Sequence, residues 1–261
     1  MFIDSHCHLS FQELRVQLPT ILDAMRQAQV QQAICICTTL EEFPEVLALA
    51  EAHDHLYASV GVHPDNEGVR EPSVEDLVQL AHHPKVVAIG ETGLDYYRLN
   101  GRSVDDMAWQ RERFRVHIRA AQRTGKPLVI HTRSSSADTL AILKEEGAGT
   151  VRGVFHCFTE DLATAQAALD LGFHISFSGI VTFKNAQSIR DVAQAMPRER
   201  VLIETDSPYL APVPYRGKLN TPAYVPHVAE TLAQLWGDSV DAVARTTTQN
   251  TRALFALPEV S

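Results

Sequence analysis

The chain has 261 residues, of which 45% are hydrophobic and 21% are charged, and its net charge is −9. This composition is typical of a globular protein with a sizeable core. The sequence contains no low-complexity tract and no apolar run near the length of a membrane span. The net charge argues against an extended basic surface for nucleic acid, although bound divalent cations would add positive charge locally. Asp4 and His6 interrupt the segment where a signal peptide needs its apolar run, so we expect a cytoplasmic protein with reduced cysteines.

Apolar and amphipathic segments alternate along the chain. In order we expect a strand over 1–5, a helix over 20–30, a strand over 32–38, a helix over 41–53, a strand over 56–62, a helix over 74–81, a strand over 86–91, a helix over 107–124, a strand over 127–131, a helix over 138–146, a strand over 153–158, a helix over 162–171, a strand over 173–177, a helix over 188–196, a strand over 201–204, and helices over 224–236 and 239–255. Continuous apolar strands between helices predict a parallel sheet that is buried on both faces.

Eight such units predict an α/β fold in which residues 1–261 form a single (β/α)8 TIM barrel. An open, doubly wound sheet is the alternative. The chain contains neither the glycine-rich dinucleotide turn nor the phosphate-binding loop that often accompanies open sheets, which favours the barrel.

Side chains that bind metals follow most of the expected strands. They are His6 and His8 after the first strand, His63 after the third, Glu91 after the fourth, His131 after the fifth, His156 after the sixth, and Glu204 and Asp206 after the eighth. Residues two apart in a strand share a face, so His6 and His8 point the same way. Taken alone, two histidines with this spacing are explained equally well as solvated residues. Because the carboxyl ends of barrel strands meet at one mouth, we expect all these side chains to lie together.

Five histidines and three carboxylates exceed the needs of one ion, since a catalytic zinc takes about three protein ligands. Two divalent cations that share a carboxylate fit better, and Glu91, between the two groups of histidines, is the expected bridge. Zinc, magnesium and manganese are the candidates, and imidazole ligands favour zinc or manganese over magnesium. We interpret the other seven histidines as solvated or packing residues, and Cys35 and Cys37 as small core residues.

Six motifs stand in order at these strand ends. They are His6-Cys7-His8, Gly61-Val62-His63-Pro64, Gly90-Glu91-Thr92-Gly93-Leu94-Asp95, Ile130-His131-Thr132-Arg133, His156-Cys157-Phe158 and Glu204-Thr205-Asp206-Ser207-Pro208. From Asp4 to about Phe255 the chain resembles the TatD family of metal-dependent hydrolases, in the amidohydrolase superfamily. The resemblance implies a deoxyribonuclease with two divalent metals.

The resemblance also implies a ligand set. His6, His8 and Asp206 would hold one metal, His131 and His156 would hold the other, and Glu91 would bridge them. His63 and Arg133 would face the substrate phosphate.

Two further catalytic roles are expected besides that of His63. Asp206 should bind metal through one oxygen and accept the proton of the attacking water with the other. Glu204 lies two residues earlier, so strand alternation places it on the same face, where it would orient metal-bound water or a neighbouring ligand. The alternative for Glu204 is an ion-paired strand residue.

The expected substrate is DNA, as single strands or frayed ends, because a net charge of −9 leaves no long basic track for a duplex. Arg216 and Lys218, in a basic loop after the last strand, would hold a substrate phosphate unless that loop is simply solvated. Tyr96, Tyr97 and Arg98 follow the fourth strand, where an aromatic ring can stack on a base. We expect a monomer without a membrane partner. The alternatives are hydrolysis of another ester or an amide, or a non-catalytic, metal-stabilised binding protein.

Overall fold

The structure is a computed structural model that describes residues 1–147 and 149–259. The strands are β1 (Phe2–Cys7), β2 (Val30–Cys35), β3 (Leu56–Val60), β4 (Val86–Asp95), β5 (Leu128–Arg133), β6 (Gly153–Phe155), β7 (His174–Phe177) and β8 (Val201–Ile203). The helices are α1 (Gln12–Arg15), α2 (Leu18–Gln27), α3 (Phe43–Ala52), α4 (Val74–Ala81), α5 (Ala108–Thr124), α6 (Ser136–Gly147), α7 (Leu162–Asp170), α8 (Gln187–Ala195), α9 (Val225–Trp236) and α10 (Val240–Phe255). Within the described residues no helix is long and apolar enough to cross a membrane.

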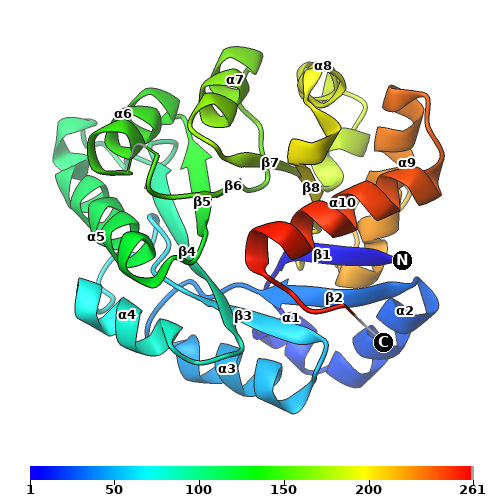
Figure 1. The fold of residues 1–261 in the computed structure, drawn as a ribbon, viewed down its shortest axis with the longest axis horizontal. Helices are drawn as coiled ribbons and strands as arrows, with labels where there is room; N and C mark the ends of the chain where they lie inside the picture. The colour runs from blue at the N-terminus through cyan, green and yellow to red at the C-terminus, as the bar shows by residue number, and fades with distance from the viewer. Residues whose placement is uncertain (148, 260–261) are drawn as a thin grey trace.

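The strands form a parallel barrel in sequence order, from β1 to β8. Its first and last strands meet beyond β8, where Cys7 and Ser207 form a parallel bridge. The Asp206 N–H donates to the His6 carbonyl, and the His8 N–H donates to the Ser207 carbonyl, each at 2.9 Å. The helices surround the strands (Figure 1). The predicted (β/α)8 barrel is confirmed, and the open sheet is excluded.

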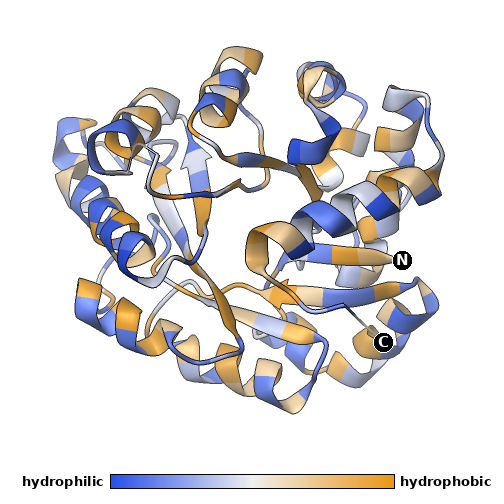
Figure 2. Cartoon of the chain, in the orientation of Figure 1, coloured by the Kyte–Doolittle hydropathy of each residue, from blue (hydrophilic) through white to orange (hydrophobic). Residues whose placement is uncertain are grey.

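Apolar side chains fill the barrel and the layer around it. Hydrophobic residues concentrate along the strands and on the helix faces turned toward them (Figure 2). Inside the barrel, one cluster joins residues of the strands to the end of α10: Ile3, Ile34, Ile36, Tyr57, Ala88, Val129, Val154, Leu202, Leu254, Phe255 and Leu257. The last turn of α10 therefore closes one end of the barrel and leaves the carboxyl ends of the strands for a site.

Two element boundaries near the N-terminus differ from expectation. Helix α2 begins at Leu18 and β2 begins at Val30, each two residues earlier than predicted. Pro19 lies in the first turn of α2, where a missing N–H leaves no hydrogen bond unmade. Gln29 has a φ of 59°, which ends the helical path and allows β2 to start sooner. The one-turn helix α1 was not predicted.

Two register shifts decide which side chains reach the mouth. They lie in β1 between Asp4 and Cys7, and in β4 between Ile89 and Thr92. Unbroken alternation would turn Ile3 and His6 to opposite faces. Instead Ile3 packs inside the barrel, and His6 joins the polar cluster at its mouth. The register shift in β4 likewise brings a residue of the barrel interior and a residue of the mouth to the same side of that strand.

Candidate metal centre

The side chains expected at the strand ends surround one cavity of about 830 Å³ at the carboxyl end of the barrel. Its lining includes His8, His63, Glu91, His131, His156 and Asp206. His6 is 1% exposed and lies against the same group of residues. The structure thus brings together all the residues that we expected to bind metal, from five different strands or the loops that follow them.

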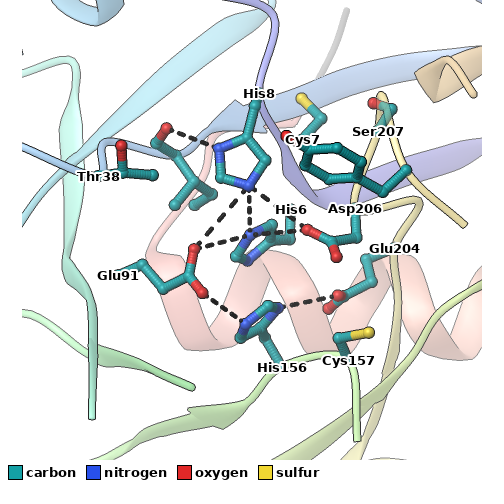
Figure 3. A network of polar contacts seen from close by, with 12 residues as sticks. His6, Cys7, His8, Thr38, Glu91, His156, Cys157, Glu204, Asp206 and Ser207 are labelled. Atoms are coloured by element: carbon teal, nitrogen blue, oxygen red, sulfur yellow. Dashed lines mark hydrogen bonds and ion pairs between the residues drawn. The ribbon is translucent and has the colours of Figure 1, made fainter. Parts of the chain in front are cut away.

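The first group of ligand-type atoms lies between β1 and the segment after β8 (Figure 3). Glu91 Oε2 is 3.3 Å from His6 Nε2 and 3.9 Å from His8 Nε2, and Asp206 Oδ1 is 3.4 Å from both nitrogens. The His8 Nδ1–H donates to the Ile36 carbonyl at 3.2 Å, so the neutral ring turns the lone pair of Nε2 toward these oxygens. Electron-pair donors that face one another in this way fit a cation between them.

The second group lies around the other oxygen of Glu91. Oε1 is 2.8 Å from His156 Nε2 and 3.2 Å from His131 Nδ1. The opposite nitrogen of each ring donates to a carboxylate, from His156 to Glu204 at 3.1 Å and from His131 to Asp95 at 2.9 Å. In their neutral form, which metal binding requires, both rings would present lone pairs beside Oε1. The two oxygens of Glu91 face two different groups of donors, which is the arrangement that a bridging ligand needs.

His63 has the opposite hydrogen-bonding pattern. Its Nε2 is 3.3 Å from both Glu91 Oε1 and His131 Nδ1, within reach of the second group. However, the Asp65 backbone N–H donates to His63 Nδ1 at 3.0 Å, so the neutral ring carries its proton on Nε2. His63 therefore points an N–H donor into the cavity. This suits a hydrogen bond to an anionic substrate better than coordination of a metal.

The pKa shifts and the buried carboxylates of the centre favour the binding of cations. Burial raises the pKa of the Glu91 carboxyl, but the charges of His156, His63 and His6 outweigh this effect and hold the pKa well below its usual range. Burial lowers the pKa of His156, yet Glu91 and Glu204 together raise it well above the ordinary value. Within the described residues, the buried Nδ1 of His6 has no hydrogen-bond partner. Buried anions among electron-pair donors are the environment that divalent cations stabilise.

Glu204 and Asp206 occupy different positions in the centre. Glu204 is fully buried and accepts from the outer nitrogen of His156, so it fixes the orientation of that ring. Asp206 lines the cavity and faces His6 and His8. The expected strand alternation does not apply here, because β8 ends at Ile203 and Asp206 has a φ of 54°.

Asp95 is the site residue that the sequence interpretation missed. We expected the fourth strand to end at Glu91, but β4 continues to Asp95. Glu91, Gly93 and Asp95 then share one face, and this spacing was the available signal. A side chain at Gly93, where φ is 130°, would collide with the His131 carbonyl, so glycine allows β4 and β5 to approach at the centre.

The candidate substrate contacts divide into two groups. Arg133 lines the cavity, and its guanidinium lies 3.7 Å from the centre of the Tyr97 ring. Arg98 also lines the cavity. Arg216 and Lys218 are not part of that lining: the former lies over Phe183 and the latter over Tyr215, at 4.2 and 5.6 Å from the ring centres. A contact from these two residues requires a substrate that extends beyond the cavity.

A (β/α)8 barrel with histidines and carboxylates gathered in two groups at its mouth is typical of metal-dependent hydrolases. The sequence model of the family described as TatD related DNase matches residues 3–256. The chain belongs to the TatD family.

Individual relatives cover nearly the whole chain. It is 47% identical to the uncharacterized metal-dependent hydrolase YcfH of Escherichia coli K12 over 257 residues, which are 97% of this chain and 95% of YcfH. It is 37% identical to the uncharacterized metal-dependent hydrolase YabD of Bacillus subtilis, with 98% and 100% covered. Among solved structures, the TatD homologue YjjV of Escherichia coli K12 superimposes with a TM-score of 0.90 at 32% identity, covering 98% of each chain.

Proposed function

We propose that this protein is a deoxyribonuclease that uses two divalent cations to hydrolyse phosphodiester bonds in single-stranded DNA or at frayed duplex ends. The observation that carries the proposal is the division of ligand-type atoms between the two oxygens of Glu91. The description of the matching family, TatD related DNase, supports the choice of substrate. His6, His8 and Asp206 would hold one cation, His131 and His156 the other, and Glu91 both.

Divalent cations at this centre would neutralise phosphoryl charge and lower the pKa of bound water. The protein supplies the remaining groups. The side chain of Asp206 is 16% exposed and borders the cavity, where it can accept a proton from the attacking water. The Nε2–H of His63 and the guanidinium of Arg133 can donate to phosphate oxygens. Nitrogen ligands in both groups favour zinc or manganese over magnesium.

The preference for single strands rests on charge and shape. A chain with a net charge of −9 offers few cations to neutralise a long duplex, and the centre lies within a cavity instead of along an exposed groove. We also propose that the enzyme is a cytoplasmic monomer. Its four cysteines are free thiols, which suits a reducing compartment.

The decisive experiment compares substrates and metals on one preparation. Protein stripped with EDTA and reloaded with Zn²⁺, Mn²⁺ or Mg²⁺ should cleave single-stranded oligonucleotides faster than closed circular duplex DNA. Asp206→Asn should retain the fold and at least one cation but lose about 10²–10⁴-fold in rate, the usual loss for a general base. Turnover of nitrophenyl esters with oligonucleotides left intact would refute the nuclease proposal and favour another ester as substrate.

A further inference from the structure

Helix α5 carries three buried polar side chains on the face that it turns toward the barrel. Gln110, Arg113 and His117 are spaced three and four residues apart, so they form one stripe along the helix. They are 2%, 3% and 0% exposed. Burying such groups is unfavourable unless each is hydrogen-bonded, and apolar residues would pack this face more simply. Their partners explain why they are polar.

Gln110 fixes the backbone of Asp95. Its side-chain oxygen accepts from the Asp95 N–H at 2.9 Å, and its side-chain nitrogen donates to the Asp95 carbonyl at 3.1 Å. The carboxylate of the same Asp95 accepts from His131 Nε2. The amide of Gln110 thus determines where Asp95 meets His131, and through it which nitrogen of His131 faces Glu91.

Arg113 fixes the loop that follows β3. Its guanidinium donates to the carbonyls of His63 and Asn66, both at 2.8 Å. It is held in turn by the Glu71 carboxylate and by the Trp109 ring, whose centre is 4.8 Å away. The backbone of His63 is therefore attached to α5 through a side chain that is almost entirely enclosed.

His117 is the third residue of the stripe, and it binds the backbone of Val62, the residue before His63. Burial lowers the pKa of its imidazole to about 4, so the ring is neutral near pH 7. Its Nδ1–H donates to the Arg113 carbonyl at 2.8 Å, and its Nε2 accepts the Val62 backbone N–H at 2.9 Å. His117 is buried, as the packing interpretation expects, and is not solvated. Its lone pair also holds the backbone at the strand end that carries His63.

We propose that Gln110, Arg113 and His117 are positioning residues that preorganise His63 and His131, and hence the second metal position, without affecting the first. This inference rests on the proposed two-metal function. In the described part of the chain, the stripe bonds to β4 and to the loop after β3, and none of its hydrogen bonds reaches β1 or the segment after β8. The two metal positions should therefore respond differently when the stripe is altered.

The test is a calorimetric zinc titration of the EDTA-stripped, full-length protein. His117→Leu keeps the bulk but removes both hydrogen bonds, whereas His117→Gln offers an acceptor to Val62 and a donor to Arg113. His117→Leu frees the backbone beside His63, whose Nε2 lies 3.3 Å from both Glu91 Oε1 and His131 Nδ1. The second zinc should therefore bind about 10-fold more weakly, at the low end of the loss that follows removal of a direct outer partner of a ligand, and the first zinc should be unchanged. His117→Gln should restore both affinities. The Val62 amide should exchange with deuterium faster in His117→Leu alone.

Arg119→Gln, on the outer face of α5, is the matched control and should bind both ions as the wild type does. If His117→Leu does not fold, Gln110→Leu carries the same expectation. Wild-type affinity for both ions in the leucine variants would overturn the inference, as would an equal loss of both ions that glutamine fails to rescue. Wild-type protein that binds two zinc ions but leaves oligonucleotides intact would refute the nuclease proposal alone, because this test measures metal affinity. Fewer than two ions in the wild type would overturn both.

Discussion

Replacing His117 with glutamine should reduce the loss of stability in mild acid. The pKa of His117 falls from 6.5 to about 4 on folding because the ring is buried. Between these values the unfolded chain binds a proton that the folded protein does not, so stability decreases as the pH falls below 6.5. Each pKa unit corresponds to about 1.4 kcal/mol, and this one group should therefore lower the free energy of unfolding by about 2 kcal/mol between pH 7 and pH 5.

His117→Gln removes this proton while leaving an acceptor for the Val62 N–H. Urea unfolding of EDTA-treated wild type and variant at pH 8, 7 and 5 measures the difference directly. From pH 8 to pH 7 the two proteins should change almost equally, because His117 is then mostly neutral in both folded and unfolded chains. From pH 7 to pH 5 the wild type should lose about 2 kcal/mol more than the variant. If the wild type and the variant lose the same free energy of unfolding down to pH 5, burial does not lower the pKa of His117.

Three further outcomes are expected at the metal centre. Glu91→Gln should weaken both cations more than any single histidine change does, because its two oxygens face both groups; metal counting that finds two ions at wild-type affinity would contradict this. Glu204→Leu should weaken binding of the second cation about 10–100-fold by freeing the outer nitrogen of His156. Glu204→Gln keeps an acceptor for that nitrogen and should keep most of the affinity. Equal losses of affinity in a zinc titration of the two variants would mean that the charge of Glu204, and not its hydrogen bond, sets the affinity. EDTA should abolish hydrolysis and Mn²⁺ should restore it, so turnover that persists in chelator would rule out a metal-dependent reaction.

The sequence by itself determined the barrel fold and which ligand-type residues gather at the carboxyl ends of its strands. Strand and helix periodicity are local properties, and they were sufficient to place eight alternating units and the helix 74–81 with the bounds that α4 has. His8, Glu91 and His131 could be assigned to one site because barrel closure gathers the ends of all strands, whatever the details of packing. Six ordered motifs made the family recognisable.

Only the tertiary structure decided how those residues face one another. The shift in β1 brings Ile3 and His6 to the same side, which no alternation rule foresees. The carboxylates that fix His131 and His156 are Asp95 and Glu204, which lie 36 and 48 residues away in sequence, so these contacts depend on barrel closure and pairing register. The same holds for His117. Helical periodicity shows that its side chain faces inward, but it does not show that its ring accepts a hydrogen bond from a backbone N–H beyond a strand end. Hydrogen bonds between distant segments are set by geometry that appears only when the segments pack together.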